Sequence, residues 1–186
     1  MDIVTGATGL LGNVLVRELC ARGRQVRAFV RKTSKLSCIS DCRVETITGD
    51  ILDQDSLVRA FRGIENVYHL VSEISIMPGF NKNLQEVNLT GTRNVIKACF
   101  ECNIKRLIYT SSIHAFREPE NGSIMDEGLP LDINSRMGQY NRTKALATKE
   151  VLDTTGHGLD AVVVCPTAVV GTYDFRVSNM GTLLIN

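Results

Sequence analysis

Three glycines at three-residue spacing stand near the start of the chain, directly after the mainly apolar residues 1–4. In residues 5–12, this spacing predicts a strand that ends in a tight turn and opens a helix. Gly6 permits the turn, Gly9 lets the backbone approach a phosphate group, and Gly12 lets the helix pack closely on the strand. The first amides of a helix lack partners and carry partial positive charge, so they attract anions. The segment therefore predicts a pyrophosphate site.

Apolar runs alternate with helical patterns along the rest of the chain. Strands are expected at residues 1–4, 25–30, 43–48, 65–71, 106–110 and 159–165, and Pro166 stops the last of them. Helices are expected from residue 10 and over residues 54–62, 82–102 and 138–154, with Asp53 as an N-cap. Parallel strands need crossover connections, so this alternation predicts an α/β fold of the Rossmann type. We expect a doubly wound parallel sheet with helices on both faces, and one dinucleotide-binding domain over residues 1–186.

Two connections in this pattern are long. Residues 111–137 are rich in turn residues and are expected to be irregular. Residues 73–83, which include Pro78 and Gly79, are expected to form the most mobile loop.

The composition is ordinary for a soluble globular protein, with 44% hydrophobic and 22% charged residues and a formal net charge of +1. This balance gives no electrostatic reason to expect nucleic acid or a membrane surface as a partner. No apolar run approaches the length that crosses a bilayer, and Met1 leads almost at once into a strand, which leaves no room for a signal peptide. We therefore expect a cytoplasmic protein.

Six cysteines remain to be explained, and in a cytoplasmic setting they are expected to be thiols. Cys99 and Cys102 have a spacing found in redox and zinc sites, and Cys38 and Cys42 offer a second pair. However, the first pair lies late in a helical pattern, the second lacks tight ligand spacing, and no histidine lies nearby in the sequence. Small buried side chains are the favoured interpretation, and no metal site is expected.

Polar residues and glycines follow the predicted strands. Ligands of parallel sheets bind at the carboxyl ends of the strands, where all of these residues would gather. In chain order, the residues at these ends are Gly6, Arg31, Asp50, Ser72, Ser112 and Pro166. The sequence thus predicts one site along a single edge of the sheet.

With these positions in hand, nearly the whole chain resembles the extended short-chain dehydrogenase/reductase family, also known as the NAD-dependent epimerase/dehydratase family. The similarity lies in residues 5–12, 49–51, 67–71, 87–92, 110–112 and 140–144. Residues 166–175 are most similar to the dihydroflavonol-reductase-like branch. The resemblance implies catalysis by Ser112, Tyr140 and Lys144, with Ser112 favoured over Ser111 by the family pattern.

The spacing of Tyr140 and Lys144 agrees with this implication, because residues four apart share one face of a helix. A cation beside a phenol lowers the pKa of that phenol, so Tyr140 is expected to exchange a proton with a substrate oxygen. Ser112 is expected to hydrogen-bond the same oxygen. The alternative interpretation of Tyr140 and Lys144 is a solvated helix face.

The cofactor is expected to bind across the strand ends. The expected cofactor-binding residues are Gly6, Thr8, Gly9, Leu10, Leu11, Gly12, Arg31, Lys35, Asp50, Ile51, Leu70, Val71, Ser72, Thr110, Tyr140, Lys144, Pro166 and Val169. An NAD-binding chain usually ends its second strand with a carboxylate, whereas here Arg31 and Lys35 would pair with a 2′-phosphate. NADP is therefore favoured, with NAD as the alternative, and a basic solvated loop is the simpler interpretation of these cations.

Three further polar residues receive structural roles. His69 lies inside an apolar strand and is expected to be structural. His114 is expected to be a hydrogen-bonded pocket or surface residue rather than a base. Asn88 looks like the family's helix asparagine, which is expected to tie backbone elements together.

The resemblance also implies a smaller C-terminal lobe that contacts the substrate, and this lobe is largely missing from a chain of 186 residues. We expect a truncated chain, an incomplete gene product or a natural short form, with exposed apolar surface that would favour a homo-oligomer. The favoured function is hydride transfer between NADP(H) and a carbonyl or secondary alcohol of a small or sugar-like substrate. The alternatives are an NAD-dependent nucleotide-sugar epimerase or dehydratase and a non-enzymatic dinucleotide-binding module that senses redox state or regulates a partner.

Overall fold

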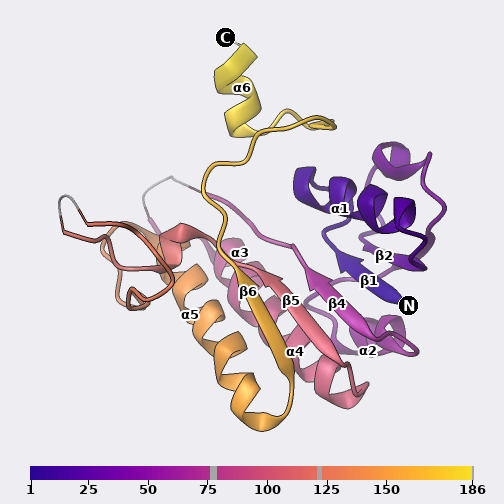
Figure 1. Ribbon diagram of the computed structural model, residues 1–186, viewed down its shortest axis with the longest axis horizontal. Coiled ribbons are helices and arrows are strands. Elements are labelled where there is room, and N and C mark those ends of the chain that lie inside the picture. Colours follow the sequence, from indigo (N-terminus) through magenta and orange to yellow (C-terminus); the bar gives the residue numbers. More distant parts are fainter. Residues whose placement is uncertain (76–78, 121–122, 186) are drawn as a thin grey trace.

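The six expected strands form one parallel sheet in the computed structural model, which describes residues 1–75, 79–120 and 123–185. The strands are β1 (Asp2–Thr5), β2 (Val26–Val30), β3 (Glu45–Thr48), β4 (Asn66–His69), β5 (Arg106–Thr110) and β6 (Asp160–Val164). Their order across the sheet is β3-β2-β1-β4-β5-β6 (Figure 1). The chain winds outward in both directions from β1, which confirms the predicted doubly wound α/β fold.

The predicted helices are present, with ends that differ by at most one residue from those expected, and the structure adds a helix after β6 that was not predicted. The helices are α1 (Leu10–Ala21), α2 (Gln54–Phe61), α3 (Lys82–Gln85), α4 (Gly91–Glu101), α5 (Gln139–Asp153) and the added α6 (Asn179–Ile185). Short 3₁₀ turns are η1 (Leu36–Ile39), η3 (Ile113–Ala115) and η4 (Thr154–His157). The predicted N-cap is confirmed, because the Asp53 side chain accepts a hydrogen bond from the Ser56 amide at the start of α2.

The helix expected over residues 82–102 is present but not uniform. A π-helical turn, η2 (Glu86–Thr90), separates α3 from α4. The hydroxyl of Thr92, the second residue of α4, donates a 2.7 Å hydrogen bond to the carbonyl oxygen of Asn88 in this turn. A side-chain donor that competes for a helix carbonyl is a local cause of such irregularity, and π-turns are frequent at functional sites.

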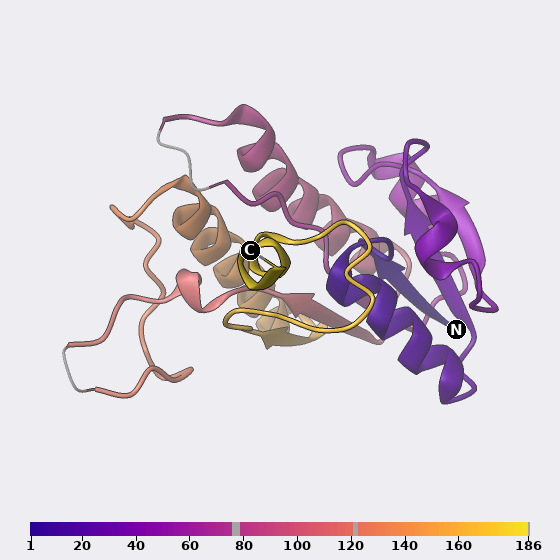
Figure 2. The same ribbon diagram turned by 90° about the horizontal axis from the view of Figure 1, so that it is seen from above.

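Helices cover the two faces of the sheet unequally. On one face, α2, α4 and α5 bury a continuous core against β1, β4 and β5, as Figures 1 and 2 show. The other face is covered by α1 and η1, which pack on β1 and β2. Ala161 and Val163 of β6 join the first core, so Val162 and Val164 point to the opposite face. They remain 42% and 48% exposed, which agrees with the exposed apolar surface expected near the end of the chain.

Close backbone packing holds α1 on β1. Gly6 has a φ of +74°, in the left-handed region where glycine is strongly favoured. A Cβ atom on Gly12 would lie 2.0 Å from the Gly6 carbonyl oxygen, which no side chain could tolerate without movement of the backbone. Both glycines therefore have the steric roles that their spacing predicted.

The loop expected over residues 73–83 is described only in part, because residues 76–78 lie outside the described residues. Glu73 and Ser75 precede this gap and have no regular secondary structure. The loop ends two residues earlier than expected, at Asn81, which caps α3 by accepting a 3.1 Å hydrogen bond from the Leu84 amide.

The six cysteines are free thiols. Cys99 is fully buried in the core, and this burial raises the pKa of its thiol, so it behaves as a small apolar side chain. Among the described residues, no group of three His, Cys, Asp or Glu side chains is arranged to hold a metal ion. In the same part of the chain, none of the helices combines the length and the apolar character that a bilayer crossing requires.

Candidate active site

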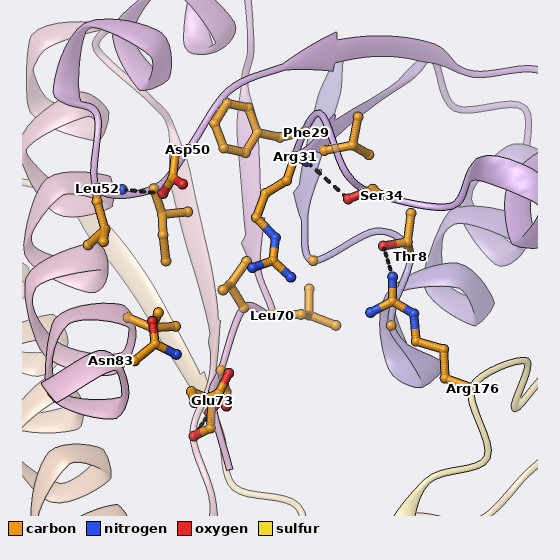
Figure 3. A pocket seen from close by; sticks show the side chains of 17 residues that line it. Thr8, Phe29, Arg31, Ser34, Asp50, Leu52, Leu70, Glu73, Asn83 and Arg176 are labelled. Carbon is orange, nitrogen blue, oxygen red and sulfur yellow. Dashed lines mark hydrogen bonds between the residues drawn. The ribbon is translucent and has the colours of Figure 1, made fainter. Parts of the chain in front are cut away.

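A cavity of about 210 Å³ lies at the carboxyl ends of β1, β2, β3 and β4 (Figure 3). Between β1 and β4 the chain changes the direction in which it adds strands, and such switch points are where ligands bind in doubly wound sheets. The cavity is lined by Gly6, Thr8, Gly9, Phe29, Val30, Arg31, Ser34, Asp50, Ile51, Leu52, Leu70, Val71, Ser72, Glu73, Asn83, Val87 and Arg176. The cavity is thus formed by the glycine turn, the ends of four strands, and residues of α3 and η2.

Half of the residues expected to bind a cofactor line this cavity, and half do not. Gly6, Thr8, Gly9, Arg31, Asp50, Ile51, Leu70, Val71 and Ser72 are lining residues. Leu10, Leu11, Gly12, Lys35, Thr110, Tyr140, Lys144, Pro166 and Val169 are not. For Gly12 the reason is steric, because it packs on Gly6 behind the turn. Lys35 is exposed at the start of η1, away from the lining.

Several lining residues were not expected from the sequence. Ser34 lies close to Arg31, whose amide donates a 3.1 Å hydrogen bond to the Ser34 hydroxyl. Asn83 belongs to α3, and Glu73 directly follows the predicted strand-end residue Ser72. Arg176 comes from the segment after β6, far from the glycine turn in the sequence, and no local pattern marks it.

The glycine turn, which leads into α1 at its N-cap Gly9, lies at the wall of the cavity. The Gly9 amide is satisfied by the Gly6 carbonyl at 2.9 Å, and no side chain caps the start of α1. The next amides of α1 are therefore available to an external acceptor, and the helix dipole favours a negative one. Because the glycine turn also leaves no room for a Cβ atom at Gly12, the residues present fit the diphosphate of a dinucleotide.

A second group of polar residues lies on β5, η3 and α5. Tyr140 and Lys144 are in the first turns of α5, and Ser112 precedes η3. Burial raises the pKa of the Tyr140 phenol, and hydrogen bonds with the Ser112 and Ser72 hydroxyls lower it by less. Tyr140 is therefore protonated at neutral pH. The expectation that Lys144 lowers the pKa of Tyr140 is not met.

The position of Lys144 explains this difference. Its side chain is buried, and its ammonium donates a 3.0 Å hydrogen bond to the Thr110 carbonyl oxygen at the end of β5. The ammonium also lies 5.1 Å from the centre of the Tyr109 ring, a cation–π distance. Burial lowers the pKa of Lys144 to about 8. The cation is thus directed to β5, and the solvated helix face considered as an alternative is excluded for Lys144.

A stability measurement tests the burial of this lysine. In the unfolded chain the pKa of a lysine is about 10.4, whereas in the fold the pKa of Lys144 is about 8. Below about pH 8 the side chain is charged in both states, and burial of this charge then costs the native state about 3 kcal/mol. Lys144→Met removes this cost and leaves the Thr110 oxygen without a donor, which costs about 1 kcal/mol. We expect the variant to be about 1–2 kcal/mol more stable than the wild type at pH 7 in urea unfolding. The gain should vanish toward about pH 10, where unfolded Lys144 also loses its proton.

The matched control is Lys149→Met on the same helix, where the lysine is exposed and pairs with Asp153. Its free energy of unfolding should stay within about 0.5 kcal/mol of the wild type at both pH values. Equal effects of the two substitutions would contradict a special cost at Lys144.

The two serines after β5 have different partners. The Ser111 hydroxyl is buried and hydrogen-bonds the Thr148 hydroxyl on α5. The Ser112 hydroxyl accepts a 3.2 Å hydrogen bond from the His114 amide and also interacts with Tyr140. His114 itself is exposed, with its ring edge-on to that of Tyr140 at 6.1 Å between centroids. The geometry therefore favours Ser112 over Ser111 as the partner of Tyr140.

A buried polar network joins this group to the glycine turn. The Thr92 hydroxyl donates its proton to the Asn88 carbonyl oxygen, so it acts as an acceptor toward Nε2–H of His69 at 3.1 Å. The other ring nitrogen, Nδ1, then accepts from the Thr5 hydroxyl at 2.7 Å. Burial, with the nearby charge of Lys144, lowers the pKa of His69 to about 3. The histidine is a neutral, fully bonded core residue, as predicted.

Asn88 continues the network to α5. Its side-chain oxygen accepts from the Glu73 amide at 2.8 Å, and its nitrogen donates to the Glu73 carbonyl at 2.9 Å. The same nitrogen lies 3.3 Å from the Thr143 hydroxyl, which donates to the Tyr140 carbonyl at 2.9 Å. Asn88 thus ties the strand that follows β4 to the helix that carries Tyr140, in agreement with its expected role.

Known proteins resemble this chain along nearly its whole length. Residues 3–182 match the 3-beta hydroxysteroid dehydrogenase/isomerase family. The chain is 37% identical to sterol demethylase protein B of Methylococcus capsulatus, over 99% of this chain and 56% of that protein. It is 31% identical to a putative dihydroflavonol 4-reductase of Synechocystis, over 98% of this chain and 53% of that protein.

Its structure is also similar to that of a short-chain dehydrogenase/reductase superfamily protein of Agrobacterium tumefaciens, solved with bound NAD. The TM-score is 0.75 at 28% identity, over 89% of this chain and 48% of the other. The chain thus spans about half the length of the curated relatives it matches. These matches confirm the resemblance that the strand-end motifs indicated, including its dihydroflavonol-reductase-like part. The chain belongs to the 3-beta hydroxysteroid dehydrogenase/isomerase family, among the extended short-chain dehydrogenases/reductases.

Proposed function

We propose that this chain carries the dinucleotide-binding half of an NADP-dependent oxidoreductase that acts on a carbonyl or secondary alcohol. The proposal rests on one observation: the anion site of the glycine turn and the group around Tyr140 lie at the same edge of the sheet, joined by one buried network. The family is NAD(P)-dependent, and its members are dehydrogenases, reductases, epimerases and dehydratases. The relatives named for sterol and dihydroflavonol chemistry suggest a rigid polycyclic substrate.

Each residue of the second group has a chemical task in this proposal. When bound, the reduced nicotinamide supplies the hydride that adds to the carbonyl carbon. Tyr140 gives its phenolic proton to the carbonyl oxygen, so that the alcohol forms, and its raised pKa keeps that proton available at neutral pH. Ser112 donates a hydrogen bond to the same oxygen as negative charge develops on it. Lys144 holds its ammonium at the end of β5, where it would bind the cofactor ribose.

The choice of NADP rests on the end of β2. Arg31 lines the cavity directly after β2, and Figure 3 shows its guanidinium extending into the space between Asp50 and Leu70. No carboxylate occupies the first positions after β2, where NAD-binding chains bind the ribose hydroxyls. A guanidinium there would form a charge-assisted pair with a 2′-phosphate.

Replacing Arg31 by alanine tests the cofactor choice. We expect the Kd for NADPH to rise about tenfold and the Kd for NADH to change by less than about twofold, measured by nicotinamide fluorescence. Lys35→Ala is the matched comparison, because Lys35 is exposed and lies outside the cavity lining, and its effect should be smaller. Equal loss of both cofactors in Arg31→Ala would contradict recognition of the 2′-phosphate.

The function itself is tested by titration and turnover. Purified protein is titrated with NADPH and NADH and then assayed with 3-oxosteroids, dihydroflavonols and nucleotide sugars. Oxidation of NADPH by a carbonyl substrate supports the proposal. Turnover of a nucleotide sugar with NAD and no net oxidation would support the epimerase or dehydratase alternative, and binding without any turnover would support a regulatory module. Failure to bind either cofactor would overturn all three.

A further inference from the structure

We infer that Arg176 is a binding residue for the diphosphate, supplied to the cavity by the segment after β6. The inference rests on the proposed function, because it requires a dinucleotide in the cavity. Arg176 lines the cavity although it lies more than a hundred residues after every other lining residue except Asn83 and Val87, which precede it by 93 and 89 positions. Its guanidinium nitrogen is 3.4 Å from the hydroxyl of Thr8 in the glycine turn.

The place of Arg176 in the cavity differs from that of Arg31. Figure 3 shows Arg31 on the side of Asp50 and Arg176 on the side of Thr8. These two are the only cationic side chains among the described lining residues. The acidic lining residues are Asp50, whose carboxylate accepts from the Leu52 amide at 2.9 Å, and Glu73. Arg176 therefore adds positive charge beside the phosphate turn, where the helix amides of α1 already favour an anion.

The backbone before Arg176 is fixed on α1. The Asn13 side chain, which is buried and also bonds the Gly9 carbonyl, donates a 3.1 Å hydrogen bond to the Tyr173 carbonyl. The Arg17 guanidinium lies 4.3 Å from the centre of the Tyr173 ring, a cation–π contact. The segment is thus attached to the same helix whose first turn faces the cavity (Figure 2).

The backbone after Arg176 is fixed by a second set of bonds. The Asp174 carboxylate accepts from the amide and the hydroxyl of Ser178, at 2.8 and 2.7 Å. Tyr173 and Val177 have φ values of +67° and +48°, in the left-handed region. For a β-branched residue such as Val177 this conformation is a true outlier, and strain of this kind gathers at ligand clamps. The contacts of Tyr173 with α1 and of Asp174 with Ser178, together with the strained backbone at Tyr173 and Val177, therefore hold the exposed Arg176 beside the glycine turn.

Ligand fragments separate this role from that of Arg31. ADP-ribose carries the diphosphate without a 2′-phosphate, and 2′-AMP carries a 2′-phosphate without a diphosphate. Both are titrated by competition against NADPH fluorescence on the wild-type chain and on Arg176→Ala. We expect Arg176→Ala to weaken ADP-ribose about tenfold and 2′-AMP by less than about twofold, because a charged hydrogen bond is lost only with the diphosphate. Arg31→Ala should give the opposite pattern.

Two further variants sharpen the result. Arg176→Lys keeps the charge but not the planar pair of donors, so its affinity for ADP-ribose should fall between those of the wild type and Arg176→Ala. Arg59→Ala removes an exposed arginine of α2 outside the cavity and should bind both fragments as the wild type does.

The possible outcomes have different meanings. If Arg176→Ala binds ADP-ribose as tightly as the wild type does, or loses both fragments equally, this inference is wrong and the proposed function stands. If the wild-type chain binds neither NADPH nor ADP-ribose, the proposed function and this inference both fall.

Discussion

Tyr140→Phe is expected to lower the turnover of a carbonyl substrate with NADPH by about 10³-fold, equivalent to about 4 kcal/mol of activation free energy. The substitution removes only the hydroxyl that would give its proton to the substrate oxygen. The ring would keep its edge-on contact with His114 and its place in the first turn of α5. The Kd for NADPH should therefore stay within about threefold of the wild-type value, so that the loss is confined to kcat.

Tyr68→Phe is the matched control for this experiment. Tyr68 is a half-buried tyrosine on β4 that packs with the α1 side of the sheet, away from Tyr140. Its loss of a hydroxyl should leave both turnover and NADPH binding unchanged. A Tyr140→Phe protein that turns over within tenfold of the wild type would remove Tyr140 from the proton transfer and direct attention to the neighbouring Ser112 and His114.

Mild acid is expected to destabilise the protein through His69. In the unfolded chain this histidine binds a proton near pH 6.5, whereas in the fold its pKa is about 3, because burial disfavours the charged ring. Between these values the unfolded state holds more protons, so stability falls as the pH falls. From about pH 7.5 to about pH 4.5, we expect His69 alone to lower the free energy of unfolding by about 2–3 kcal/mol.

Urea unfolding of His69→Gln isolates this contribution, because carboxyl groups titrate alike in both proteins. The variant should be less stable than the wild type by about 1–3 kcal/mol at pH 7, since glutamine cannot satisfy both Thr5 and Thr92. It should then lose less stability on acidification, so the two proteins converge near about pH 4.5. His157→Gln, at an exposed histidine of η4, should follow the wild type throughout. Parallel pH profiles for His69→Gln and the wild type would contradict the assigned role.

The sequence was sufficient to predict the sheet and the packing of the glycine turn for physical reasons. The strands β1, β2, β4 and β5 place apolar residues in the core, where both faces of a parallel sheet are covered, whereas the edge strand β3 is mostly polar and exposed. The glycines of residues 5–12 act through the local backbone, so their roles at Gly6 and Gly12 could be predicted from spacing alone. The ends of the predicted helices lie within one residue of their expected places, because a cap such as Asp53 acts on amides only a few residues away in the sequence.

Features that depend on distant contacts could not be predicted in this way. Four-residue spacing placed Lys144 beside Tyr140, but it carried no information on the Thr110 carbonyl of β5, which receives the ammonium. The spacing also gave no information on the burial of Tyr140, and this burial raises the pKa of the phenol. Arg176 enters the cavity because Tyr173 rests on α1, a contact between residues about 160 positions apart that no periodicity encodes.

The contact between Gly6 and Gly12 joins the turn after β1 to α1 by main chain against main chain. The Gly6 oxygen occupies the space that a side chain at position 12 would need, so any larger residue there would push the turn and the helix apart. A contact made by the main chain alone does not depend on the size of neighbouring side chains, which makes this end of the fold a suitable fixed frame for redesign of the cavity lining.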